Sequence, residues 1–296
     1  MAQAQSRSGG AISASFGRTG LPHIGGRRTF AGMAGAAASV ARWVIITGHS
    51  RGMGEAMAAQ CLAQGAGVIG ISRGLNSSLA EAAQHSGAPF QQWQCDLTDG
   101  TAAAERLSEW LAQLDPKGIR SIALINNAAL LSTIQPLHTV AAPSLVSALR
   151  VGLEAPVLLT QAFLAGTQRW VLEDAWAGDR RVLQISSGLG RSAMASVGSY
   201  CAIKAGLDNF TASVALDQQQ LGAVGAKVVS LAPGIIATDM QVQLRTAAAE
   251  DFPDQDKFRH FHASGALDSP SEAAQKVLAF LAREDFGEVV IADVRD

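Results

Sequence analysis

From residue 42 onward, short apolar runs alternate with longer stretches in which apolar positions recur at helical spacing. Runs typical of buried strands lie at 43–46, 67–71, 90–95, 121–125, 182–185, 227–231 and 288–291. Stretches typical of helices lie at 52–63, 101–114, 143–169, 200–220 and 271–281. Because the strand runs carry apolar residues on both faces, the pattern predicts an α/β fold whose parallel sheet is covered by helices on both sides.

The beginning of the chain has a different composition. Residues 1–54 contain no Asp or Glu but carry six Arg residues, and the chain is rich in Gly, Ala and Ser up to about residue 38. An Arg-rich, acid-poor segment is typical of a transit peptide. For residues 1–40 we favour a disordered leader, or a start codon assigned too early with Met33 as the true start. Residues 41–296 show no internal boundary and are expected to form one domain.

The overall composition narrows the possible functions. Apolar residues make up 48% of the chain and charged residues 16%, which suits a folded domain with a sizeable core. The net charge of −2 gives no general attraction to nucleic acid or to an anionic membrane surface. The sequence lacks an uncharged apolar run of about 18 residues, so we expect no membrane span. Cys61, Cys95 and Cys201 have neither paired nor metal-ligand spacing, which favours free thiols, no metal site and a cytoplasmic location.

A glycine-rich loop connects the first predicted strand to the first predicted helix. It has the spacing G-x-x-x-G-x-G, and its candidate ligand residues are Thr47, Gly48, Ser50, Arg51, Gly52, Met53 and Gly54. Glycines let the backbone approach a pyrophosphate closely, and the helix N-terminus offers free N–H groups to the anion. The loop therefore predicts a dinucleotide site, with a glycine turn that binds no ligand as the alternative.

The end of the second predicted strand indicates which dinucleotide is bound. An NAD site usually has an acidic residue there to hold the ribose 2′-hydroxyl, whereas this strand ends in Ser72 and Arg73. Arg51 in the glycine loop can reach the same region. Because guanidinium groups bind phosphate through paired hydrogen bonds, we expect NADP(H) rather than NAD(H). A solvated surface cation is the alternative for Arg73.

The candidate catalytic residues follow the fifth predicted strand. Ser187 lies thirteen positions before Tyr200, and Lys204 lies one helical turn after Tyr200. A neighbouring ammonium stabilises phenolate, so we expect the pKa of Tyr200 to fall toward neutrality. Such a phenol can protonate a carbonyl oxygen while the carbon receives hydride, and the Ser187 hydroxyl can hold that oxygen.

This ordered set of motifs resembles the short-chain dehydrogenases/reductases over residues 42–296. The resemblance rests on the glycine loop, Asn126-Asn127-Ala128-Ala129, Ser187, the Tyr200/Lys204 pair and the segment 233–238. It implies a doubly wound, Rossmann-like sheet of seven parallel strands, and a homodimer or homotetramer. It also implies that Asp96 contacts the adenine, that Asn126 lines the adenosine side, and that Thr238 binds the nicotinamide carboxamide. Further implied cofactor contacts are Leu97, Ala128, Pro233, Gly234, Ile236 and the catalytic Tyr200 and Lys204.

A narrower resemblance, to sepiapterin reductases and bacterial benzil reductases, lies in the last sixty residues. Its residues are Thr238-Asp239-Met240-Gln241, the segment 251–261 and Glu284-Asp285-Phe286-Gly287. It implies reduction of a ketone or vicinal diketone. The family's pterin-anchoring acid matches Asp268, although a helix N-terminal region at 268–270 explains this residue equally well.

Three questions stay open at this point. Gly152 stands where the family has an Asn that holds a proton-relay water, and we expect the free space at Gly152 to admit a water at the backbone. Met240, Phe252, Phe258 and Phe261 form either an apolar substrate wall or ordinary core. Alternative functions are reduction of 3-oxoacyl thioesters or steroids, and dinucleotide-dependent regulation without turnover.

We expect the segment around His260 and His262 to be mobile and to bind no metal.

Overall fold

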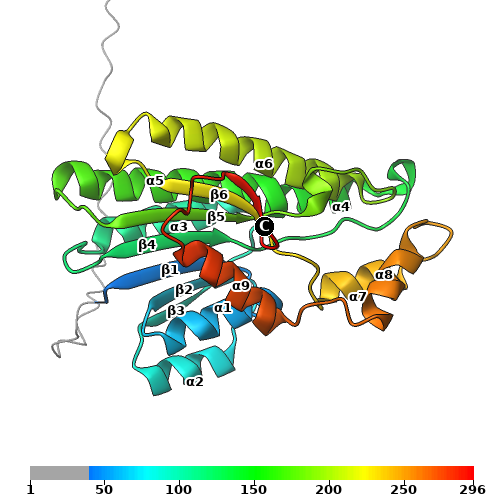
Figure 1. Cartoon of the computed structure of the whole chain (residues 1–296), viewed down its shortest axis with the longest axis horizontal. Helices are drawn as coiled ribbons and strands as arrows, with labels where there is room; N and C mark the ends of the chain where they lie inside the picture. Colours follow the sequence, from blue (N-terminus) through cyan, green and yellow to red (C-terminus); the bar gives the residue numbers. More distant parts are fainter. Residues whose placement is uncertain (1–39) are drawn as a thin grey trace, which may run out of the picture. The chain divides into compact units, whose positions relative to one another are not determined.

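The structure, a computed structural model, describes residues 40–296, so the leader expected at residues 1–40 lies almost wholly outside the described residues. Seven parallel strands form one sheet in the order β3-β2-β1-β4-β5-β6-β7 (Figure 1). The strands are β1 (Arg42–Thr47), β2 (Gly67–Ser72), β3 (Phe90–Gln94), β4 (Ser121–Asn126), β5 (Asp179–Ile185), β6 (Lys227–Ala232) and β7 (Ile291–Asp293). The strand order runs outward in both directions from β1, so the predicted doubly wound, Rossmann-like sheet is confirmed.

Helices cover both faces of the sheet. On one face lie α1 (Gly52–Ala63), α2 (Ser77–Ser86) and α9 (Pro270–Ala282). On the other lie α3 (Gly100–Gln113), α5 (Ala155–Glu173) and α6 (Gly198–Gln219). The strand β1 feeds both layers, because Val44 and Ile46 enter the first core while Trp43 and Ile45 enter the second. This alternation follows from the period of two along a strand, and it explains why the strand runs are apolar throughout.

Several elements differ from the sequence prediction. The stretch expected as one helix at 143–169 consists of α4 (Ala142–Leu149), a π-helical turn (Arg150–Glu154) and α5. The seventh strand was expected at 288–291 but occupies Ile291–Asp293. Its apolar run was misleading because Val289 is 62% exposed, whereas Phe286 just before it is buried. Helix α2 was not predicted, although Asn76 caps it by accepting a hydrogen bond from the Leu79 amide at 3.0 Å.

Two further helices, α7 (Asp239–Thr246) and α8 (Gln255–Ala263), follow β6 and pack against each other away from the sheet layers (Figure 1). His260 and His262 lie in the last turn of α8, so the segment that was expected to be mobile is helical here. Phe252 and Phe258 anchor these helices in a small core of their own, with ring centroids 5.5 Å apart.

By length and composition alone, the helical stretch Ala142–Glu173 could cross a membrane. In the fold, however, its second half packs on the sheet as α5. Leu159, Ala162, Phe163 and Trp170 are all buried in the core between α5, α3 and the strands. Since these apolar residues already have protein partners, we assign α5 to the core.

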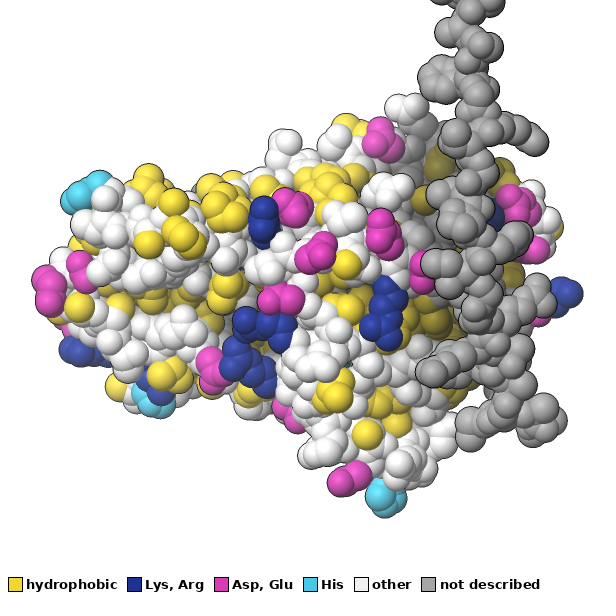
Figure 2. Space-filling view, turned by 180° about the vertical axis from the view of Figure 1, so that it is seen from behind, with side chains coloured by type: hydrophobic (Ala, Val, Ile, Leu, Met, Phe, Trp, Pro, Cys, Tyr) yellow, Lys and Arg dark blue, Asp and Glu magenta, His cyan; other side chains and the backbone are white. Residues whose placement is uncertain are grey.

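Basic and acidic side chains are intermingled on the molecular face drawn in Figure 2. Several of the ion pairs in the described residues are exposed, including Arg283–Asp285 at 2.7 Å and Arg51–Asp239 at 2.8 Å. Exposed pairs of this kind contribute about 0–1 kcal/mol each, because water and salt screen them. The apolar layers on the two sheet faces therefore stabilise the fold far more than its surface charges do.

Two substitutions on α5 test this assignment of the core. Phe163 is fully buried, so Phe163→Ala should lower the free energy of unfolding by about 3–5 kcal/mol, measured by urea denaturation. Leu172 on the same helix is 74% exposed, and Leu172→Ala should change the free energy by less than about 0.5 kcal/mol. Equal losses in the two variants would contradict the packing of α5 on the sheet.

Candidate active site

A cavity of about 1130 Å³ lies along the carboxyl edge of the sheet. Its walls come from the loops after β1 through β6 and from α6, α7 and α8. The cavity passes the gap between the loops after β1 and β4, where the strand order reverses. In open α/β sheets, the connections diverge at this point and leave a crevice for a ligand. The fold thus places the cavity where a dinucleotide normally binds.

The cavity gathers nearly all of the residues that the sequence indicated. Those that line it are Gly48, Ser50, Arg51, Gly52, Met53, Gly54, Ser72, Arg73, Asp96, Leu97, Ala128, Ser187, Tyr200, Lys204, Pro233, Gly234, Ile236 and Thr238. Thr47 and Asn126 do not line it. The glycine-loop residues and the catalytic candidates therefore face one continuous space, although they are far apart in the sequence.

The glycine loop has the shape that a pyrophosphate requires. Gly48 and Gly52 have φ values of +72° and +61°, which side chains of L-residues rarely permit. A Cβ atom on Gly54 would lie 2.1 Å from the Gly48 carbonyl oxygen, so the loop folds directly onto the first turn of α1. No side chain caps α1, which leaves its first N–H groups available to an anion at the cavity. These residues fit a dinucleotide.

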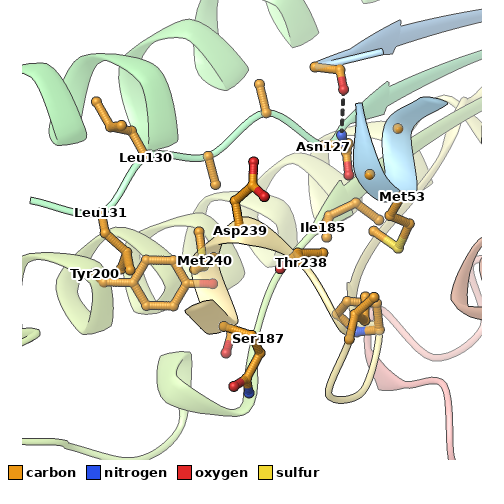
Figure 3. Close-up of a pocket in the computed structure, with 18 of the residues that line it drawn as sticks. Met53, Asn127, Leu130, Leu131, Ile185, Ser187, Tyr200, Thr238, Asp239 and Met240 are labelled. Atoms are coloured by element: carbon orange, nitrogen blue, oxygen red, sulfur yellow. Dashed lines mark hydrogen bonds between the residues drawn. The ribbon is translucent and has the colours of Figure 1, made fainter. Parts of the chain in front are cut away.

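The predicted roles of Thr47 and Asn126 as cofactor contacts need correction. Asn126 is 2% exposed and its amide donates to the Thr160 hydroxyl at 3.2 Å, on the side of the sheet covered by α5. Its neighbour Asn127 faces the cavity instead (Figure 3) and donates to the Thr47 carbonyl at 2.9 Å. The Thr47 hydroxyl is also buried, because it accepts the backbone N–H groups of Asn127 and Ala128. Thr47 and Asn126 therefore shape the wall from behind.

At the end of β2, Ser72 and Arg73 line the cavity, as expected. Arg51 lines it too, but its guanidinium pairs with Asp239 at the start of α7 rather than standing free. Both partners are largely exposed, so the pair is weak enough to open for a stronger anion. Asp96 is held as a carboxylate, because a hydrogen bond from the Thr98 amide lowers its pKa.

The three catalytic candidates meet at the other end of the cavity. Tyr200 reaches it from α6, and Ser187 reaches it from the end of β5 (Figure 3). The nearby Ser187 hydroxyl lowers the pKa of Tyr200. Lys204 lies one turn further along α6, with its Nζ 5.5 Å from the centroid of the Tyr200 ring. The arrangement offers a hydroxyl, a phenol and an ammonium to one reacting group.

The expectation that the pKa of Tyr200 falls toward neutrality was wrong. Burial raises the pKa of Tyr200 to about 12, because desolvation of the phenolate outweighs the lowering effect of the Ser187 hydroxyl. Burial also lowers the pKa of Lys204 to about 8. The Lys204 ammonium donates to the Ile185 carbonyl at 2.6 Å, so it is directed at the backbone rather than at the phenol. Desolvation therefore outweighs the attraction between the two groups.

Asp208 supports this site and was not identified from the sequence. It lies one turn after Lys204 on α6, and its carboxylate raises the pKa of Lys204. The same carboxylate accepts hydrogen bonds from Ser186 at 2.5 Å and from Ser230 at 2.6 Å. The two hydroxyl donors hold the carboxylate in place, where its charge stabilises the Lys204 cation. An acid four residues after a catalytic Lys was the available sequence signal.

The space expected beside Gly152 is not open. Gly152 is buried in the π-helical turn between α4 and α5, and a Cβ atom there would lie 2.7 Å from Ile203 on α6. Ile203 thus fills the volume that an Asn side chain would need. The missing Asn side chain is replaced by packing, and the water expected at the Gly152 backbone stays a prediction.

The apolar wall opposite the catalytic residues comes mainly from α7 and α8. Met240, Phe258 and Phe261 line the cavity, whereas Phe252 is fully buried behind them. Asp268 does not line the cavity, since its carboxylate binds the Lys276 ammonium at 2.7 Å. The α9 capping box is formed by the residue after it, Ser269, with Glu272. The contacts of Asp268 thus favour a structural role for this residue over substrate binding.

Comparison with known proteins identifies the family. Residues 42–249 match the family model described as short chain dehydrogenase. The chain belongs to the short-chain dehydrogenase family. Among the described residues of this short-chain dehydrogenase, no three His, Cys, Asp or Glu side chains are grouped as a metal would require.

Several known proteins are similar to this short-chain dehydrogenase over most of its length. A benzil reductase ((S)-benzoin forming) from Bacillus cereus is 35% identical over 254 residues, which cover 85% of this chain and 99% of the relative. Sepiapterin reductase from Mus musculus is 29% identical over 198 residues, covering 66% of this chain and 72% of that enzyme. A solved metagenomic short-chain oxidoreductase in complex with NADP has a TM-score of 0.63 at 26% identity, covering 86% of this chain and 97% of that one. The resemblance inferred from the sequence motifs is thereby confirmed.

The tight turn at Gly54 gives a prediction for cofactor binding. Gly54→Ala should weaken the binding of nicotinamide dinucleotides at least about tenfold, because the added Cβ displaces the Gly48 carbonyl and with it the loop. Quenching of intrinsic fluorescence on titration measures the dissociation constant. Gly198→Ala is the matched control, since a Cβ there would meet no atom within 4 Å. Unchanged binding in Gly54→Ala would contradict the loop's role.

Proposed function

We propose that this short-chain dehydrogenase reduces a ketone or a vicinal diketone to the alcohol, with NADP(H) as the source of hydride. The observation that carries the proposal is the meeting of Ser187, Tyr200 and Lys204 in the same cavity as the glycine loop. The similarity to a benzil reductase supports a diketone substrate, and the apolar side chains of Met240, Phe258 and Phe261 suit its aromatic or aliphatic groups.

In this proposal, the chain's own residues position the carbonyl group and supply its proton. The bound nicotinamide supplies hydride to the carbonyl carbon. The Ser187 hydroxyl donates a hydrogen bond to the carbonyl oxygen as negative charge develops there. Tyr200 donates its proton to that oxygen, and its high pKa keeps the proton in place at physiological pH until the more basic alkoxide forms. The Lys204 charge then stabilises the phenolate that remains.

The preference for NADP(H) rests on the end of β2. Ser72 and Arg73 stand where an acid would repel a 2′-phosphate, and both line the cavity. The similar metagenomic oxidoreductase in complex with NADP supports the same choice. Titration with both reduced cofactors tests it, and NADPH should bind at least about tenfold more tightly than NADH. Equal dissociation constants would contradict the preference but leave the carbonyl chemistry intact.

We also propose that the enzyme acts in the cytoplasm as a homodimer or homotetramer. One observation supports association. Val146, Leu149 and Leu172 leave apolar surface exposed along α4 and α5. The helices α7 and α8, which line the substrate side of the cavity, belong to the same chain as the catalytic residues. Each protomer therefore carries the groups that the proposed chemistry requires.

The catalytic proposal is tested by NADPH consumption with benzil, diacetyl and sepiapterin. Tyr200→Phe should lower kcat by about 100- to 10,000-fold, because the positioned proton donor is lost. The dissociation constant for NADPH should change less than about threefold, since the ring is retained. Cys201→Ala, the next residue on α6, is the control and should keep its activity. Full activity in Tyr200→Phe would exclude Tyr200 as the donor.

The pH dependence of turnover tests the role of Asp208. Lys204 has a pKa of about 8, so turnover that requires its charge should fall as pH rises through that value. Asp208→Asn removes the carboxylate that raises the pKa of Lys204, so the alkaline fall should move to lower pH. Asp217→Asn, at an exposed position of the same helix, should leave the profile unchanged. An unmoved profile in Asp208→Asn would contradict the coupling.

A further inference from the structure

His49 is a buried histidine immediately behind the cofactor end of the cavity. It is the second residue after β1, is fully buried, and does not line the cavity. Its ring lies against the backbone of β2, where a Cβ on Gly70 would come within 2.2 Å of the imidazole. Because Gly70 has no side chain, β2 leaves room for the ring at this position. Such a close fit holds the imidazole in one orientation.

The Nε2 atom of His49 carries a proton in this arrangement. Its partner is Oε1 of Gln92 on β3, at 2.9 Å. The orientation of the Gln92 amide is fixed from its other side, since Oε1 accepts from the Asn76 N–H at 2.7 Å and Nε2 donates to the Asn76 carbonyl at 3.1 Å. An amide oxygen can only accept, so the imidazole must donate.

The Nδ1 atom of His49 faces a hydroxyl that has a second partner. Ser72 Oγ lies 3.1 Å from Nδ1 and 2.7 Å from the Gly74 carbonyl oxygen. A hydroxyl has one proton, and a carbonyl oxygen can only accept. With a neutral imidazole, Ser72 donates to one of the two acceptors and the other contact is lost. With imidazolium, Nδ1 donates to Ser72 and Ser72 donates to Gly74, so every contact is satisfied.

Burial opposes this charge in the protein alone. Desolvation lowers the pKa of His49, while the Gln92 side chain and the Ile71 backbone raise it by less. From β3, the uncharged Phe90 ring has its centroid 6.1 Å from that of the imidazole. The charged groups nearby along the chain and on the neighbouring elements are Glu55 on α1, which accepts from Asn76 at 2.8 Å, Arg73, which follows Ser72, and Arg51 in the same loop, which pairs with Asp239. None of these forms an ion pair with the imidazole among the described residues.

We propose that His49 takes up a proton when the 2′-phosphate of NADP(H) binds at Ser72 and Arg73, and so acts as a positioning and specificity-determining residue for the cofactor. This inference rests on the proposed preference for NADP(H). The phosphate supplies the negative charge that the buried cation lacks, and the cation in turn fixes the Ser72 hydroxyl and the 72–74 turn. NADH carries no such phosphate and leaves His49 neutral.

The sign of the pH effect follows from this coupling. Proton uptake on binding means that NADPH affinity is greatest at low pH and falls as pH rises, by at most about tenfold per pH unit. The 2′-phosphate has the opposite effect near its own pKa of about 6, since the dianion binds more tightly. Measurements at pH 7–8 therefore avoid the titration of the phosphate, and comparison with His49→Gln separates His49 from Lys204, whose pKa is about 8.

Two measurements on the full chain test the proposal. In NMR spectra of ¹³C/¹⁵N-labelled imidazoles, the His49 resonance should shift from neutral to imidazolium on addition of NADPH at pH 7.5, and should not shift with NADH. Calorimetry in two buffers of different ionisation enthalpy should show that wild-type protein takes up close to one proton more with NADPH than His49→Gln does. His85→Gln, at an exposed position of α2, is the control and should behave as wild type.

The outcomes separate the two proposals. A neutral His49 in the NADPH complex of wild-type protein, or equal proton uptake by wild type and His49→Gln, overturns the role of His49 and leaves the cofactor preference standing. Equal affinities for NADPH and NADH overturn both. The NMR measurement requires no substitution, so it decides the question even where His49→Gln fails to fold.

Discussion

The hydroxyl of Thr47 ties the ends of β1 and β4 together, and the geometry of the site depends on this contact. It accepts the N–H groups of Asn127 and Ala128, both at 2.9 Å, while the Asn127 amide donates back to the Thr47 carbonyl. Parallel strands that diverge at this edge would otherwise leave these backbone groups unpaired in a buried place. Because the glycine loop follows Thr47 directly, the same contact fixes where the loop begins.

Burial decides the electrostatics at the other end of the cavity. Lys204 is 2% exposed, and the Asp208 carboxylate behind it is almost as buried. A buried ammonium without a partner would lose its proton, so the carboxylate, itself held by Ser186 and Ser230, maintains the charge. At Tyr200, burial outweighs the effect of the neighbouring groups, so its pKa rises. The spacing in the sequence predicted that Tyr200 and Lys204 lie on one face of a helix. Whether desolvation outweighs the attraction between their charged forms could be judged only from the burial that the structure shows.

The sequence predicted what is local and missed what depends on contacts between distant segments. The parallel sheet, the glycine loop and the Ser187, Tyr200 and Lys204 set follow from apolar period and short motifs, and the family resemblance implied the doubly wound topology that the fold has. Which of two adjacent asparagines faces the cavity depends on the side of β4 that each occupies, and Asn126 faces α5. The space at Gly152 is filled by Ile203 from another helix, which no motif around residue 152 reveals.

The same arrangement occurs at both ends of the cavity: the side chains that line it are held by titratable side chains that lie behind its wall. Asp208 stands behind Lys204, and His49 stands behind Ser72. Neither supporting residue lines the cavity, so neither is exchanged easily for a ligand atom or for water. Their hydrogen-bond partners are wholly or partly buried, which holds each supporting side chain in place. Under the proposal for His49, a ligand that changes the charge at the wall also changes the protonation of the imidazole behind it, and cofactor choice is linked to pH in this way.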